Sequence, residues 1–194
     1  GMSANANTQG SIAIGYQTKS YGTRDSIAVG TGANASGFSS IAIGELTISK
    51  QINGIALGRG AHANAGSAIS LGVSAKTSAV NSITMGIGAN SYAPGAEENM
   101  IAIGKSAFAN NSNSITIGQS SKALNTNTIA LGTLANANNS DAIAIGQYTK
   151  SIQSNTISLG RSANANQTNA ISVGLESIAN EVDSISFGRV SRAH

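Results

Sequence analysis

The stretch Ile115-Thr116-Ile117-Gly118 returns one repeat later as Ile129-Ala130-Leu131-Gly132, and this unit decides the fold. Thirteen copies occur, ending at Gly15, Gly30, Gly44, Gly58, Gly72, Gly86, Gly104, Gly118, Gly132, Gly146, Gly160, Gly174 and Gly188. Successive glycines are fourteen positions apart, except for fifteen between the first two and eighteen between Gly86 and Gly104. A unit this short cannot bury a core alone, so the repeat predicts stacked coils of a solenoid.

The first strand of each coil contains two large aliphatic residues with a small residue between them. Residues two apart share one face of a strand, so the aliphatic pair predicts one face and the middle residue the other. We expect the aliphatic pair to fill the interior and the middle residue to pack against a partner. This small row consists of Ala13, Ala28, Ala42, Ala56, Ser70, Thr84, Ala102, Thr116, Ala130, Ala144, Ser158, Ser172 and Ser186.

A second short strand is expected after each glycine turn. The residues three and five positions after the glycine, such as Ala33 and Ala35 or Ser121 and Ala123, are always small and should face the interior. The residue between them varies widely, from Lys19 to Phe108, as an outward position does. Two strands and two turns per repeat predict one coil of an all-β, parallel β-roll, with about 13 coils in the chain.

Composition argues against several other classes of protein. Aromatic residues make up 4% and charged residues 10% of the chain, which has no cysteine and a net charge of +3. The basic residues are scattered without interleaved aromatics, so nucleic acid is not an expected partner. Apolar runs fall far short of the roughly 20 residues of a membrane span, so this fragment is not expected to insert into a membrane.

The repeat and its flanks, as in Asn113-Ser114-Ile115-Thr116-Ile117-Gly118-Gln119-Ser120-Ser121, resemble the head repeat of YadA-like trimeric autotransporter adhesins, a haemagglutinin-repeat family linked to virulence. The resemblance implies a left-handed β-roll that assembles as a homotrimer, with the small row facing the other two chains. It also implies adhesion to host cells or to matrix proteins such as collagen, fibronectin or laminin. The implied location is the bacterial cell surface, with anchorage in the outer membrane through a C-terminal region absent here.

We expect residues 1–10 to be a tag remnant and N-terminal edge, and residues 11–194 to form the β-roll head. Four additional residues precede Gly104 and predict an insertion loop at about 91–100. Insertions in solenoids map to loops and sometimes to binding sites, with a tolerated insertion as the preferred alternative. Isolated exposed apolar residues are normal on protein surfaces, and those of the outward row are the other possible contact points. The candidate ligand-binding residues are therefore Tyr92, Pro94, Glu97 and Glu98 in the insertion, and Ile48, Phe108 and Ile178 on the outward row.

No catalytic, metal or cofactor site is predicted. The chain has two histidines, His62 on the outward row and His194 at its end, so no metal cluster or nucleophilic triad can be assembled. Trimeric left-handed acyltransferases have a longer coil made of three hexapeptides and a catalytic histidine, and this chain has neither. The two functions left open are an adhesin head, which is favoured, and a passive spacer that projects another domain from the cell.

Overall fold

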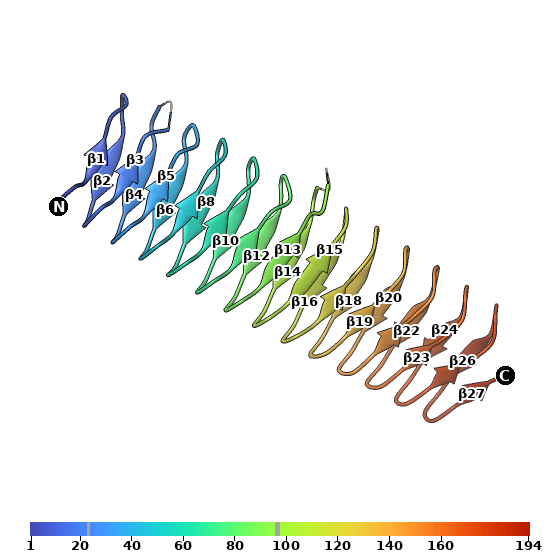
Figure 1. Cartoon of the computed structure of the whole chain (residues 1–194). Helices are drawn as coiled ribbons and strands as arrows, with labels where there is room; N and C mark the ends of the chain where they lie inside the picture. Colours follow the sequence, from blue (N-terminus) through green and yellow to red (C-terminus); the bar gives the residue numbers. More distant parts are fainter. Residues whose placement is uncertain (23, 96–97) are drawn as a thin grey trace. The chain divides into compact units, whose positions relative to one another are not determined.

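The computed structural model describes residues 1–22, 24–95 and 98–194, and every element in this part of the chain is a β-strand. Two compact units are present, Gly1–Asn99 and Met100–His194. Each consists of coils with two strands apiece, and the two strands of a coil belong to different parallel sheets (Figure 1). The even-numbered strands are the Ile-small-aliphatic segments, and the odd-numbered strands are the short segments after each glycine turn.

The first unit contains thirteen strands. Its odd-numbered sheet, in spatial order, consists of β1 (Asn5–Ala6), β3 (Lys19–Ser20), β5 (Asn34–Ala35), β7 (Ile48–Ser49), β9 (His62–Ala63), β11 (Lys76–Thr77) and β13 (Asn90–Tyr92). Its even-numbered sheet consists of β2 (Ile12–Ile14), β4 (Ile27–Val29), β6 (Ile41–Ile43), β8 (Ile55–Leu57), β10 (Ile69–Leu71) and β12 (Ile83–Met85). The N-terminal edge thus contributes β1, which pairs in parallel with β3.

The second unit contains fourteen strands. Its even-numbered sheet consists of β14 (Ile101–Ile103), β16 (Ile115–Ile117), β18 (Ile129–Leu131), β20 (Ile143–Ile145), β22 (Ile157–Leu159), β24 (Ile171–Val173) and β26 (Ile185–Phe187). Its odd-numbered sheet consists of β15 (Phe108–Asn110), β17 (Lys122–Ala123), β19 (Asn136–Ala137), β21 (Lys150–Ser151), β23 (Asn164–Ala165), β25 (Ile178–Ala179) and β27 (Arg192–Ala193).

Coils stack in parallel with equivalent positions of the repeat in register. Thr116 of β16 lies beside Ala130 of β18, and the amide of Ile115 donates to the Thr128 carbonyl at 2.8 Å. This parallel pairing places each residue beside the residue one repeat later. A coil of a different length would shift the pairing out of register, which explains why the period is nearly constant. The predicted all-β parallel solenoid of about 13 coils is confirmed.

In most coils, the glycine that ends the even-numbered strand lies in a turn where the next coil leaves no room for a side chain. Gly132 has a φ of +128°, and a Cβ atom there would lie 2.6 Å from the Gly146 carbonyl oxygen of the next coil. Two residues further on, Leu134 also has a positive φ, of 59°. Positive φ is strained for residues other than glycine. The geometry of the turn therefore imposes this φ on whichever residue occupies the position, including leucine.

The interior of the coil is the reverse of the predicted one. The middle residue of each even-numbered strand points inward: Ala130 and Thr116 have no exposed surface, and Ser186 has only 2%. The large aliphatic residues on either side, such as Ile115 and Ile117, point outward. The predicted partner-facing row is therefore buried within its own chain at Ala28, Ala42, Ala56, Ser70, Thr84, Ala102, Thr116, Ala130, Ala144, Ser158, Ser172 and Ser186, and half-buried at Ala13 in the first coil.

The interior is narrow because small residues line it from both sides. The inward positions of the odd-numbered strands and of the preceding turns were predicted correctly, and residues such as Ala35, Ala123 and Ala135 are fully buried. Two facing rows of alanine, serine and threonine leave no room for the two aliphatic side chains of each coil. Protein interiors are packed as densely as organic crystals, so this interior has no space for the large side chains, and they lie outside.

Hydroxyl groups in this interior pair with one another across the coil. The Thr116 hydroxyl donates to the Ser121 hydroxyl at 2.6 Å, and Ser172 and Ser177 form the same pair at 2.6 Å. In another coil, Ser151 donates to the Ile143 carbonyl at 2.6 Å. These bonds satisfy buried polar groups that would otherwise be costly, so serine and threonine can alternate with alanine in the core.

The second turn of the coil carries ladders of side-chain amides in the second unit. Asn113 donates from Nδ2 to Oδ1 of Asn127 at 3.1 Å, and Asn127 donates in turn to Asp141 at 3.0 Å. A second ladder runs from Asn155 through Asn169 to Asp183, with distances of 3.1 and 2.8 Å. Each ladder ends at an aspartate, because a carboxylate accepts from the preceding asparagine but has no N–H to donate onward.

Candidate functional surfaces

The even-numbered strands present an aliphatic face to the outside in each unit. Ile117 is 42% exposed and Leu71 37%, and all the aliphatic residues at these positions are exposed or half-buried. The two outward residues of each coil stack on those of the next, because neighbouring coils are in register. A soluble monomer rarely exposes such a continuous apolar surface, so this face has the character of an interface.

The odd-numbered strands present a polar face that carries positive charge. One outward residue per coil forms what we call the outer row, in which Lys19, Lys76, Lys122, Lys150 and Arg192 appear. The row contains no acidic residue, although the chain has eight. The other members of the outer row are asparagine, isoleucine, phenylalanine and histidine, so the face combines hydrogen-bonding, apolar and cationic side chains.

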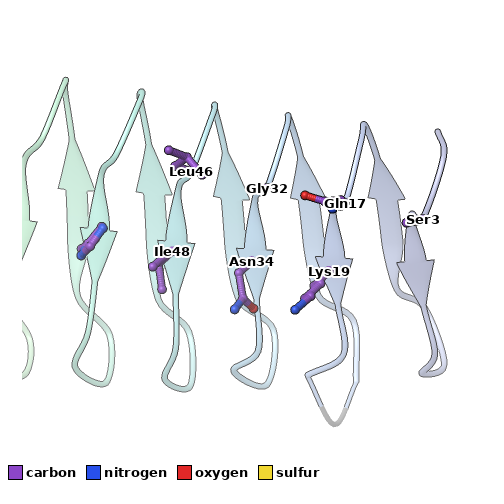
Figure 2. A pocket seen from close by; sticks show the side chains of 8 residues that line it. Ser3, Gln17, Lys19, Gly32, Asn34, Leu46 and Ile48 are labelled. Carbon is purple, nitrogen blue, oxygen red and sulfur yellow. The ribbon is translucent and has the colours of Figure 1, made fainter.

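A groove in the first unit runs along this face (Figure 2). It has a volume of about 580 Å³. Its floor consists of Lys19, Asn34, Ile48 and His62 from four neighbouring strands, β3 to β9. One edge is formed by turn residues with positive φ, namely Ser3, Gln17, Gly32 and Leu46. Three successive coils thus each supply one floor residue and one edge residue to the same groove, and the coils at its two ends supply one residue each.

His62 lies between basic side chains at one end of this groove. Partial burial lowers the pKa of His62, and the charges of Lys76 and Lys50 lower it further. Both effects disfavour the imidazolium form. The lowered pKa therefore favours a neutral, hydrogen-bonding His62 side chain at neutral pH.

A smaller groove of the same design lies in the second unit and has a volume of about 260 Å³. Lys122, Asn136 and Lys150 form its floor, from strands β17, β19 and β21. Leu134 and Tyr148, both with positive φ, form its edge and are 44% and 50% exposed. Sequence reasoning missed this groove because its edge residues, Leu134 and Tyr148, have no residue type in common. They share only their position in the repeat, two residues after the turn glycine.

The predicted insertion residues occupy the end of the first unit. Tyr92 ends β13 and is 47% exposed, and Pro94 is exposed as well. Glu98 is exposed and forms a parallel bridge with Val80. Glu97 lies outside the described residues. Tyr92 lies away from Ile48, since β9 and β11 separate β7, the strand of Ile48, from β13.

The predicted apolar contacts on the outer row are divided between the two units. Ile48 lines the groove of the first unit, whereas Phe108 and Ile178 are half-buried residues of β15 and β25 in the second unit. Four odd-numbered strands lie between β15 and β25. The structure therefore places these residues on the predicted face, as separate positions.

In the described parts of the chain, no group of three histidine, cysteine, aspartate or glutamate side chains is placed to hold a metal ion. Within the same residues, none of the secondary structure is a helix with the length and apolar character needed to cross a membrane.

Comparison with known proteins identifies the repeat. The family model of the YadA head domain repeat matches residues 3–18, 24–45, 35–61, 49–72, 123–149 and 153–177, together more than half of the chain. A search of curated proteins finds no match. The matched segments lie in both units and include glycine turns, inward small residues and outward aliphatic pairs of the kind described above, such as Gly132, Ala130 and Leu131. The chain belongs to the YadA head domain repeat family, whose members are adhesins of the cell surface.

Proposed function

We propose that this chain is the adhesive head of a bacterial surface protein that attaches the cell to host cells or extracellular matrix. The observation that carries the proposal is the division of each coil into an aliphatic outward face and a groove-bearing polar outward face. The aliphatic face suits self-association, which leaves the polar face free for a ligand. Repetition along the coils multiplies weak contacts through avidity. An outer-membrane anchor elsewhere in the full-length protein would display the head.

The assembly proposed here is a homotrimer in which the aliphatic faces of three copies meet. This revises the predicted interface, because the small row is inside its own chain while the aliphatic pairs are outside. Burial of apolar area stabilises association by about 25 cal/mol per Å². Every coil contributes two large apolar residues to the face, so the interface would extend along each unit.

The assembly is tested by placing charges on the aliphatic face. Ile117→Lys combined with Leu131→Lys adds two cations to outward positions of β16 and β18. Their burial against other copies without counter-charges would cost several kcal/mol, so the double variant should be a folded monomer by light scattering. Asn164→Lys on the odd-numbered face is the control and should remain trimeric. A monomeric wild-type chain, or a trimeric double variant, would contradict this interface.

Adhesion is tested with the trimeric protein on immobilised collagen, fibronectin and laminin and on cultured epithelial cells. Saturable binding that withstands washing is expected, and a monomeric double variant should bind more weakly because avidity is lost. Absence of binding on every surface would favour the alternative function of a passive spacer.

A further inference from the structure

The groove of the second unit has an unusual charge distribution for so small a surface. Lys122 and Lys150 both line it, and no carboxylate does. Among the described residues, neither ammonium group takes part in an ion pair. The two lysines are therefore available to an anionic ligand from outside.

The spacing of the two lysine backbones is set by the sheet. Lys122 lies on β17 and Lys150 on β21, with Asn136 of β19 between them in register. Neighbouring parallel strands are about 4.8 Å apart, so the two lysine backbones are separated by about 10 Å. An extended ligand lying across the strands would meet a cation, an amide and a second cation in turn.

The edge of the groove supplies a different kind of contact. Tyr148 presents half of its surface to solvent beside Lys150, and Leu134 continues the apolar edge. An exposed tyrosine offers an apolar ring face and a polar hydroxyl tip, which suits a ligand with both C–H and O–H groups. The volume of about 260 Å³ lies just below the roughly 300–1,000 Å³ of pockets for drug-sized ligands, and accommodates one sugar ring.

We propose that this groove binds an acidic oligosaccharide, with Lys122 and Lys150 on its sulfate or carboxylate groups, Asn136 on a hydroxyl group, and Tyr148 against one sugar ring. The inference deepens the proposed adhesive function, because it assigns that function a ligand class and a location. Charge-assisted hydrogen bonds from the lysines provide the strongest contacts. The saccharide is favoured over single-stranded nucleic acid because one aromatic side chain borders the groove, whereas sequence-tolerant nucleic-acid sites stack successive bases on several.

The test measures binding of fluorescent hexasaccharides to the purified chain by anisotropy. Three probes separate the charges: a sulfated heparin hexasaccharide, its unsulfated but carboxylated backbone, and a neutral N-acetylglucosamine hexamer. We expect an affinity order that follows probe charge, and binding that weakens as salt is raised. Lys122→Gln with Lys150→Gln should weaken sulfated-probe binding by about 30-fold, as expected from the loss of two charge-assisted bonds.

Matched controls isolate the groove from net charge and from folding. Lys105→Gln with Arg161→Gln removes the same charge from turn residues of the same unit that do not line the groove, and should weaken binding less than about threefold. Tyr148→Asn removes the ring but keeps a residue that tolerates positive φ, so binding should fall while circular dichroism and melting temperature remain unchanged.

Several outcomes would overturn the assignment. Equal losses in the groove and control variants would show a diffuse charge effect, and equal binding of a single-stranded DNA hexamer would show a general polyanion surface. Binding of wild-type protein to matrix or cells that the groove variants leave unchanged, without saccharide binding, would refute this inference and retain the adhesive function. Failure to bind any saccharide, matrix or cell would refute both.

Discussion

The glycine ladder offers a direct test of how tightly coils stack. In Gly132→Ala the new Cβ would lie 2.6 Å from the carbonyl oxygen of Gly146 and 2.7 Å from its carbonyl carbon. Both atoms are backbone of the next coil, so neither can move without opening the stack. In Gly188→Ala the nearest atom is the Ser191 Cβ at 4.0 Å, although the φ of +122° is nearly the same as the +128° of Gly132.

The pair therefore separates conformational strain from steric conflict. Both variants incur the strain of an L-residue at positive φ, about 1–3 kcal/mol. Only Gly132→Ala adds overpacking, which typically costs a further 1–3 kcal/mol. We expect the free energy of unfolding to fall by about 2–6 kcal/mol in Gly132→Ala and by about 1–3 kcal/mol in Gly188→Ala.

Guanidinium titration followed by far-ultraviolet circular dichroism measures both variants, at one protein concentration because association shifts apparent stability. Gly132→Ala should unfold at a clearly lower midpoint than Gly188→Ala. Equal midpoints would refute the claim that glycine is required at this turn by contact with the next coil.

Three other changes test the turns, the ladders and the interior, and one tests the titration of His62. Val190 is β-branched with a φ of 56°, so Val190→Asn should raise the free energy of unfolding by about 1 kcal/mol in the same titration. Asp141→Asn should let residue 141 donate to Asn155 and join the two ladders, a gain of about 0.5–1.5 kcal/mol; no gain would show that side-chain ladders do not stabilise the stack. Ala130→Leu should destabilise the chain by at least about 1–3 kcal/mol, and a silent change would contradict the inward placement of this row. The pKa of His62 is lower in the folded chain than in the unfolded chain, so protonation of His62 favours unfolding. The contribution of His62 to the free energy of unfolding is therefore fully present above pH 6.5 and is lost as the pH falls through the folded-state pKa. Melting temperatures of His62→Gln should lack this decline.

Much of the fold follows from the period of the sequence. Thirteen glycines at nearly constant spacing predict coils in register, and residues two apart predict which side chains share a face. The rows represented by Ala33 and Ala35 were assigned correctly to the interior, and the row represented by Lys122 to the outside. These assignments succeed because residues that are always small indicate a packed interior, whereas residues that vary freely indicate a solvent-facing position.

The orientation of the even-numbered strands could not be read in the same way. Alternation separates Ile115 and Ile117 from Thr116 but does not say which set is inside. Hydrophobicity favours isoleucine as the interior residue, whereas the available volume favours threonine, because the facing row is already made of small residues such as Ser121. Volume decides the outcome, and the hydroxyl pair of Thr116 and Ser121 removes the polar cost of that choice.

The grooves are a consequence of combining residues from neighbouring coils. Lys122 and Lys150 are two repeats apart in the sequence, yet they share one floor because successive odd-numbered strands place the same repeat position in line. Tyr148 joins them only because the turn after Gly146 adopts positive φ at that position. A pattern of separate rows predicts the face on which a ligand can bind, but a particular site also depends on which residues coincide in adjacent coils.

With the small residues of the even-numbered strands inside and the aliphatic residues outside, the repeat contains three sets of residues with different roles. Small inward residues such as Ala130 and Ala123 hold the two sheets together, aliphatic residues such as Ile117 face outward from one sheet, and residues such as Lys122 face outward from the other. Because the two outward faces lie on opposite sides of a coil, substitutions on one should have little energetic coupling to the other. The odd-numbered face can therefore vary from coil to coil without loss of the stack or of the aliphatic surface, which explains why its outward residues vary while the inward residues on either side of them stay small.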